Sequence, residues 1–479
     1  CYVAAEKLSV QSRENTSSRM AVFDERRAGI SEMIDGLGVA MSVNAQDAKA
    51  VSKALLIGDR EDISMVLREK FNRAGVGHLL AISGLHIGIV ATVAFAIFRW
   101  LVTWFSPVLW AGWARRTAAI LTFVPILAYG FLAGMSPSTQ RAVIMVSVFL
   151  LTLLFDRDQD LINTIGIAGM LILIINPPAL FSISFQLSFT AVLVIVWGLS
   201  LLRPFLQKAQ GIKAALVAKG VAFMAVTLLA TVGTAPLVMT YFNQVSLIGL
   251  VVNVFAIPLV GFLAVPLGLL AVFVQLFSTG LASVCLQLSH WILGKTILVI
   301  DFFSGLPGAA LKTITPSFVE IGLFYLLLAG FFNWFSIRHH EKPSHLPIGV
   351  RQGIAYGMLL VAVFGGVLDV GYWVHQRFWH KDLRITIFDV GQGSAALLEL
   401  PGGRNLLIDG GGFADNTVFD TGKNIIAPYL LRNKIKTIHT LFLSHPNSDH
   451  LNGLIYIAGQ FNVSKVITNN ESSPTMGYR

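Results

Sequence analysis

The 479-residue sequence contains only two cysteines, Cys1 and Cys285, and few charged residues. Two cysteines exclude a disulfide framework and a cysteine-rich metal site. Charged residues make up 13% of the chain, whereas soluble domains have about 25%. No segment resembles a glycine-rich ATP-binding loop, and the first residues show no signal-peptide pattern. Because the first methionine is Met20, we expect a further segment upstream of Cys1. Low charge and long apolar runs predict a polytopic membrane protein.

Ten apolar runs are long enough, or nearly so, to cross a bilayer, which takes about 20 residues. They lie near 79–104, 117–135, 140–155, 161–177, 185–202, 215–239, 246–275, 281–300, 317–336 and 352–374. The 246–275 run contains Pro258 and Pro266, so we expect a broken helix or a hairpin there. Before the first run, apolar spacing predicts two short amphipathic helices that are interrupted near Gly58 and Asp59.

Positive charge is concentrated in the membrane part, where residues 78–376 have 14 lysines and arginines against 7 acidic residues. This surplus fits positive-inside topology, a path for an anionic substrate, or both. If the first run crosses inward, the outside loops hold little more than Arg141 and Lys312. The inside loops then hold Arg99, Arg115, Arg116, Arg157, Arg203, Lys208, Lys213, Lys219, Arg338, Lys342 and Arg351. With ten spans, both ends of the chain are expected outside the cytoplasm.

Polar side chains interrupt several of the apolar runs. Ser83 and His86 lie in "AISGLHIG", Gln186 lies in "SISFQLSFT", and Asn253 lies in "VVNVFAIP". Such residues are costly in a bilayer, so they either pack against neighbouring helices or line a wet path. The phenylalanines beside Gln186 could stack nucleobases, although lipid contact or packing is the commoner use of such a stripe.

After residue 383, short β-like segments alternate with helical ones, which predicts an α/β module. In "LSHPNSDH", a strand leads into a turn with His445, Asn447, Asp449 and His450. Imidazole and carboxylate ligands together suit zinc or manganese, whereas the Asn447 amide is a weak ligand. No histidine or aspartate follows His450, so we expect an incomplete metal site in this chain, or a surface loop without metal.

Three longer segments, "HLLAISGLHIG", "SISFQLSFTAVL" and "NVFAIPLVGFLAVPLGLL", closely resemble the ComEC family of inner-membrane DNA-uptake proteins. The resemblance covers about residues 33–335. It implies a channel that moves single-stranded DNA into the cytoplasm during natural transformation. It also implies roles in that channel for Ser83, His86 and the Gln186 region. A surface DNA receptor and a cytoplasmic helicase or single-strand-binding protein are the partners it implies.

The C-terminal segments "FDVGQGSAALLELPGG", "LLIDGGG" and "LSHPNSDHLNGL" look like the metallo-β-lactamase-like domain that follows the channel in many members of this family. The resemblance implies a nuclease with two metals that degrades one DNA strand, and it makes Asp449 a catalytic candidate. Asp389 and Asp409 would support the site at strand ends. Relatives often have aspartate where this chain has Ser394, so no ligand role is assigned to Ser394.

The expected fold is a polytopic α-helical membrane protein with about ten transmembrane helices, followed by a truncated α/β metallo-β-lactamase-like domain. Residues 1–32 would be the tail of an OB-like region, 33–376 the channel domain, and 377–479 the first half of the hydrolase-like domain, outside the cytoplasm. The expected function is transport of single-stranded DNA across the cytoplasmic membrane. The alternatives are a membrane-anchored metal-dependent phosphodiesterase or nuclease, and a transporter of small solutes or lipids.

Overall fold

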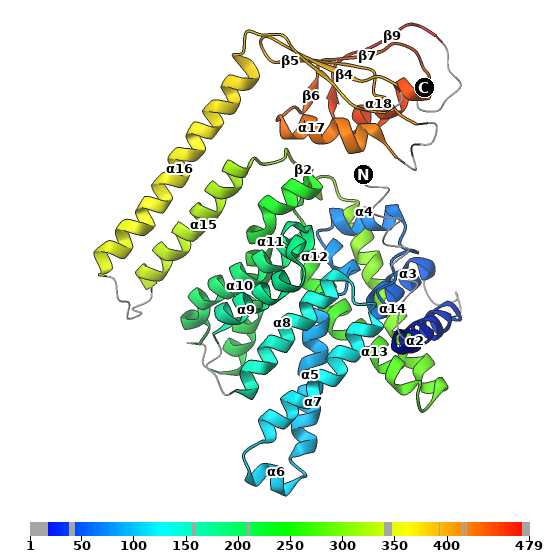
Figure 1. Cartoon of the computed structure of the whole chain (residues 1–479), viewed down its shortest axis with the longest axis vertical. Helices are drawn as coiled ribbons and strands as arrows, with labels where there is room; N and C mark the ends of the chain where they lie inside the picture. The colour runs from blue at the N-terminus through cyan, green and yellow to red at the C-terminus, as the bar shows by residue number, and fades with distance from the viewer. Residues whose placement is uncertain are drawn as a thin grey trace. The chain divides into compact units, whose positions relative to one another are not determined.

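The structure is a computed structural model that describes residues 18–37, 44–155, 160–207, 211–339, 347–391, 393–413, 416 and 419–471 (Figure 1). It consists of two compact units. The first unit comprises residues 1–234 with 245–311, and the second comprises 235–244 with 312–479. Arg157, Lys208 and Lys342, three of the cations assigned to cytoplasmic loops, lie outside the described residues, as do Cys1 and the rest of 1–17.

The first unit is helical. Its elements are α2 (Ser18–Asp35), α3 (Ala45–Leu56), α4 (Met65–Arg73), η2 (Gly77–Leu80), α5 (Gly84–Val102), α6 (Ser106–Trp110), α7 (Ala114–Leu132), α8 (Pro137–Leu154), α9 (Leu161–Ile175), η3 (Pro177–Phe181), α10 (Ile183–Gln207), α11 (Ile212–Phe242), α12 (Gly249–Ala256), η4 (Ile257–Ala264), α13 (Val265–Val274) and α14 (Thr279–Ser304). Two short strands, β1 (Gln244–Ser246) and β2 (Ala310–Lys312), pair with each other.

Within the described part of the chain, nine helices are long and apolar enough to cross a membrane. They are Gly84–Val102, Ala114–Leu132, Pro137–Leu154, Ile183–Leu206, Ile212–Phe242, Gly249–Val274, Thr279–Ser304, Phe318–His339 and Ile348–Phe378. The remaining predicted run, 161–177, forms the shorter apolar helix Leu161–Ile175. It ends where Pro177 and Pro178 start a separate 3₁₀ turn. The prediction of a multi-pass helical membrane protein is confirmed.

The span Gly249–Val274 is one helix with an irregular middle. Residues Ile257–Ala264 wind as a π-helix between the α-helical segments α12 and α13. Proline has no N–H and its ring crowds the preceding turn, so Pro258 and Pro266 account for the local change in winding. The run is therefore a continuous helix with a π-helical middle, and neither the predicted break nor the predicted hairpin is observed.

The two predicted amphipathic helices are α3 and α4, and Gly58 lies between them with a φ of +75°. Val51 and Leu55 of α3, with Leu67 and Phe71 of α4, are buried in one core. The same core contains apolar side chains of α12, η4, α13 and α14. Burial of this size stabilises each side chain by about 1.5–3 kcal/mol, which holds the short helices on the membrane helices.

The second unit contains α15 (Phe318–His339) and α16 (Ile348–Phe378), which pack side by side, and a C-terminal α/β module (Figure 1). The module's elements are β3 (Arg384–Ile387), β4 (Ala396–Leu400), β5 (Arg404–Ile408), η5 (Gly422–Ile426), α17 (Ala427–Arg432), β6 (Thr437–Ile438), β7 (Thr440–Leu443), α18 (Ser448–Gln460), β8 (Asn462–Val463) and β9 (Val466–Thr468). The predicted alternation of strands and helices is confirmed.

The main sheet has the order β3-β4-β5-β7-β9. The β3–β4 and β4–β5 pairs are antiparallel, whereas β5–β7 and β7–β9 are parallel. Strands β6 and β8 form a separate parallel pair. The core side chains Leu397, Leu407 and Leu441 contact apolar residues of α17 and α18. Parallel neighbours end at the same edge of a sheet, so the loops after β5 and β7 meet there.

Two ion pairs fasten the module to α15 and α16. Arg377 Nη1 of α16 lies 3.1 Å from Glu399 Oε1 and 3.4 Å from Asn405 Oδ1. Lys434 Nζ lies 2.6 Å from Glu320 Oε2 of α15 and donates a 2.7 Å hydrogen bond to the Thr315 carbonyl. Glu399 and Asn405 are partners on adjacent strands. Arg377 therefore explains why the buried face of the sheet contains polar residues at this point.

Candidate functional site

The predicted metal-binding turn lies at the carboxyl edge of the parallel strands β5 and β7. Asp409 directly follows β5, His445 lies two residues after β7, and Asp449 and His450 are in the first turn of α18. Because Ile408 and Phe442 are register partners, the two loops start side by side. The topology thus joins segments about 35 residues apart in sequence, as for Asp409 and Ser444.

His445, Asp449 and His450 each offer one ligand atom, and these three atoms lie within 4.8 Å of one another. All three residues are partly exposed. The ring centroids of His445 and His450 are 3.9 Å apart, and His450 Nε2 is 3.5 Å from Asp449 Oδ2. Two imidazoles and a carboxylate in this arrangement form a donor set that can bind a single divalent ion.

Asp409 is the hydrogen-bonding centre beneath this group. Its carboxylate accepts from the Ser444 backbone N–H at 2.8 Å and from the Ser444 hydroxyl at 2.7 Å. It also accepts from the Ser394 hydroxyl at 3.2 Å and lies 2.8 Å from His450 Nδ1. Burial alone would raise the pKa of Asp409, but the hydrogen bonds from Ser444 and His450 outweigh it and hold the pKa below its usual value. The carboxylate is therefore ionised at neutral pH.

The Asp409 contact orients the imidazole of His450. An ionised carboxylate at Nδ1 favours a proton on that nitrogen, which leaves Nε2 as the ligand atom of the imidazole. Carboxylate–histidine pairs of this kind set the tautomer of metal-binding histidines. The donor chemistry of His450 therefore fits a metal ligand.

Asp409 has a φ of +54°, in the left-handed region that aspartate adopts only at a cost of about 1–2 kcal/mol. Glycines in the loop after β5 and in α18 allow these two segments to approach closely. A Cβ at Gly453 would lie 2.0 Å from the Gly410 carbonyl oxygen and 2.5 Å from the Thr421 hydroxyl. The Gly453 N–H donates to the Gly411 carbonyl at 3.0 Å. This close backbone approach brings α18 and the β5 loop together, and so brings His450 to Asp409.

Three other residues named from the sequence have different surroundings. Asn447 is exposed at the N-cap of α18, and its side chain makes no capping hydrogen bond. Ser394, to which no role was assigned, lies 3.2 Å from His450 Nδ1 and so belongs to the Asp409 cluster. Asp389 is exposed and accepts only a 3.4 Å bond from Gly391 among the bonds of the described residues. No role was predicted for Ser444, although it stands between β7 and the ligand candidate His445 in the sequence.

In the membrane helices, Ser83 and His86 lie at the start of α5. His86 is fully buried, and its Nδ1 accepts from the Ser83 N–H at 3.2 Å. Nε2 has no hydrogen-bond partner among the described residues. A buried imidazole nitrogen without a partner is costly, which keeps His86 as a candidate site residue.

The other two intramembrane candidates lie on different helices. Gln186 of α10 donates from Nε2 to the Leu180 carbonyl at 3.1 Å. Asn253 of α12 is 5% exposed, and its Oδ1 has no partner among the described residues. Phe185 and Phe189 stack on each other at 4.2 Å within a buried cluster. That packing accounts for Phe185 and Phe189 without nucleobases.

Comparison with known proteins places these features in a family. Residues 55–338 match the model "Competence protein", and residues 388–477 match "Metallo-beta-lactamase superfamily". "ComE operon protein 3" of Bacillus subtilis is 26% identical over 85% of this chain and 49% of its own length. "Recombination protein 2" of Haemophilus influenzae is 27% identical over 89% of this chain and 54% of its own length. "Competence protein ComA" of Neisseria gonorrhoeae is 26% identical, with shares of 85% and 52%.

The chain spans about half the length of the curated relatives it matches. No solved structure matches it. The superfamily match in the module is in keeping with divalent-metal binding. Since the first family model covers more than half of the chain, this multi-pass membrane protein belongs to the Competence protein family.

Proposed function

We propose that this protein moves a single strand of DNA across the cytoplasmic membrane during natural transformation. The match of residues 55–338 to the competence family carries the proposal. It is supported by the buried polar atoms His86 Nε2 and Asn253 Oδ1, which have no hydrogen-bond partner among the described residues. Ionisable residues within membrane helices commonly mark substrate pathways, whereas partnered polar residues commonly join helices. Ser83 and Gln186 are further candidates for that path.

Substitution of the buried polar residues tests the translocation role. We expect His86→Ala and Asn253→Ala to abolish uptake of labelled DNA into the cytoplasm while DNA still binds at the cell surface. Gln287→Ala is the matched control, because Gln287 is exposed on α14 and bonds only to Ser283 among the bonds described. Normal transformation in a strain that lacks the whole protein would refute the proposal.

For the C-terminal module, we infer that His445, Asp449 and His450 bind a divalent metal, zinc or manganese, with Asn447 as a weaker neighbour. The cluster of three ligand atoms within 4.8 Å supports this assignment. When bound, such a metal polarises a phosphodiester and acidifies water. Asp409 holds His450 in the ligand tautomer, and Ser444 and Ser394 hold Asp409.

A nuclease that degrades the strand that is not transported is the activity this site best supports, with Asp449 as the catalytic candidate. The positive-inside rule favours an extracytoplasmic position for the module, where incoming duplex DNA would meet it. The purified protein with a complete C-terminal domain and Mn²⁺ or Zn²⁺ should cleave labelled DNA, and Asp449→Asn should abolish cleavage. Asp389→Asn removes a nearby exposed charge and should leave cleavage intact.

The two proposed activities can be separated. If Asp449→Asn blocks cleavage but uptake of supplied single strands continues, the channel and the nuclease act independently. If the membrane helices served only as an anchor for a phosphodiesterase, His86→Ala would leave uptake unchanged. Single-stranded DNA and the bilayer are the direct partners in this proposal. A surface DNA receptor and a cytoplasmic helicase or single-strand-binding protein are the proposed protein partners, which in vivo cross-linking from the loops would identify.

A further inference from the structure

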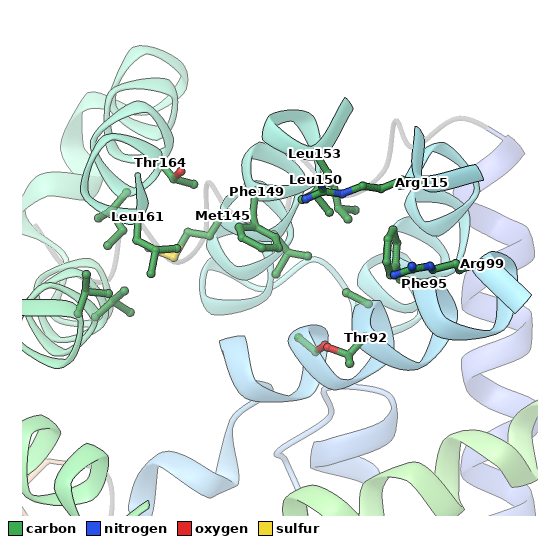
Figure 2. Close-up of a pocket in the computed structure, with 16 residues that line it drawn as sticks. Thr92, Phe95, Arg99, Arg115, Met145, Phe149, Leu150, Leu153, Leu161 and Thr164 are labelled. Carbon is green, nitrogen blue, oxygen red and sulfur yellow. The ribbon is translucent and has the colours of Figure 1, made fainter. Parts of the chain in front are cut away.

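A cavity of about 690 Å³ lies between α5, α7, α8, α9 and α10 of the first unit (Figure 2). Its size is within the range of about 300–1,000 Å³ that holds small ligands. The lining is mostly apolar and includes Phe95, Met145 and Phe149. Thr92 and Thr164 add hydroxyl groups, but the Thr92 hydroxyl already donates to the Gly88 carbonyl. The wall therefore suits a hydrocarbon chain better than a polar solute.

Two cations are among the lining side chains. Arg99 of α5 and Arg115 of α7 both border the cavity, as do Leu161 and Thr164 of α9 (Figure 2). Neither guanidinium has a hydrogen bond or ion pair with any residue that the structure describes. Two arginines without anionic partners form a ready binding site for a phosphate group, because each can donate two parallel hydrogen bonds. The cavity thus combines an anion site with an apolar body.

Neighbouring tryptophans set the depth of the two arginines in the bilayer. The segment from the end of α5 through α6 to the start of α7 has four exposed tryptophans: Trp100, Trp104, Trp110 and Trp113. Trp110 is 91% exposed. Exposed tryptophans on membrane proteins concentrate at the level of the lipid head groups. Arg99 and Arg115 adjoin this segment, so they lie at the depth of lipid phosphates.

We propose that this cavity binds one anionic phospholipid, with its phosphate between Arg99 and Arg115 and an acyl chain along the apolar wall. The positive-inside rule places this side of the helices at the cytoplasmic leaflet, which is rich in anionic lipid. A DNA strand would be a poor match as a bound ligand, because it carries a phosphate at every nucleotide and the lining has only two cations. This inference does not depend on DNA transport or on the metal site.

The test uses the full chain in nanodiscs of phosphatidylcholine, to which phosphatidylglycerol is added, with bound lipid measured by native mass spectrometry. One basic residue contributes about 1 kcal/mol to attraction of anionic lipid, so Arg99→Gln with Arg115→Gln should weaken binding about 30-fold. The control Lys213→Gln with Lys219→Gln removes the same charge from α11, at residues that do not line the cavity. It should leave binding unchanged.

A second variant tests the apolar part. Gly88 lines the cavity, and a Cβ there would meet no atom within 4 Å, so Gly88→Leu should fill the space without disturbing the fold. We expect it to displace the lipid while both arginines remain. The proposal would be overturned if the double arginine variant or Gly88→Leu bound phosphatidylglycerol as tightly as the wild type. It would also be overturned if the wild type bound phosphatidylcholine as tightly as phosphatidylglycerol. So would displacement of the lipid by a single-stranded oligonucleotide, which would assign the cavity to nucleic acid, or by soluble glycerol phosphate, which lacks chains.

Discussion

Replacing Asp409 with asparagine tests whether this residue organises the metal site. The amide oxygen can still accept from the Ser444 N–H, but an amide N–H₂ replaces the oxygen that faces His450 Nδ1 at 2.8 Å. His450 must then give up the proton on Nδ1 and carry it on Nε2, which removes its lone pair from the metal side. Loss of such a supporting carboxylate typically weakens metal binding by about 10- to 100-fold. We expect a loss of that size for Mn²⁺ and Zn²⁺.

The same substitution should lower the stability of the metal-free protein. A hydrogen bond to a charged group contributes about 1.5–3 kcal/mol, and Asp409 is 3% exposed, so solvent cannot replace the lost bond to His450. Because the folded-state pKa of Asp409 is lowered, its stabilising effect is present above the unfolded pKa of about 3.9 and disappears as pH falls through the folded value. The Asp409→Asn protein should lack this part of the acid dependence.

Titration calorimetry of the purified full chain would measure metal affinity, and thermal unfolding between pH 3 and 7 would measure stability. Asp389→Asn is the control, because it removes an equal charge from an exposed residue near the same strand ends. If Asp409→Asn bound metal as tightly as the Asp389→Asn control, the proposed orientation of His450 would be wrong.

Three further substitutions have defined outcomes. Gly453→Ala should destabilise the module by about 1–3 kcal/mol and weaken metal binding, because the added Cβ would overlap the Gly410 carbonyl. Gly459→Ala is the control on the same helix: its Cβ meets no atom, so stability and metal binding should both be unchanged. Lys434→Met should lower the unfolding temperature, because it removes the cation that pairs with Glu320, at a cost of about 3 kcal/mol. Lys436→Met changes an exposed lysine and should not lower it. Equal unfolding temperatures for the two variants would contradict this prediction. Asn447→His should tighten Zn²⁺ binding, since imidazole is a stronger zinc ligand than an amide. A competition assay with a chromophoric chelator would measure the change in affinity. No gain in affinity would mean that residue 447 lies outside the coordination sphere.

The membrane helices were predictable because the thickness of the bilayer fixes the length of an apolar run. Hydropathy located the Leu161–Ile175 helix, but only the structure shows that it stops short of Pro177. The motif at residues 443–450 located three ligand candidates, since they are adjacent in sequence. Asp409 was placed only as a supporting residue, and its four contacts depend on the parallel pairing of β5 with β7, which periodicity alone does not reveal.

The ion pair between Lys434 and Glu320 could not be predicted at all, because 114 residues separate the two side chains. The sequence around each residue carries no signal of the other: Glu320 lies near the end of a predicted span, and Lys434 lies in a segment predicted as helical. The same holds for Arg377 with Glu399, 22 residues apart. Long-range pairs of this kind are set by the way the module packs against α15 and α16.

These two ion pairs have a practical consequence for anyone who wishes to isolate the hydrolase-like module. Cutting the chain at the end of α16 would follow the family boundary, yet it would leave Lys434, Glu399 and Asn405 without their partners. A fragment that begins at Lys312 retains α15 and α16 and keeps both pairs intact. Such a fragment contains two apolar helices and needs detergent or lipid, so inactivity of a soluble piece would not test the proposed nuclease role.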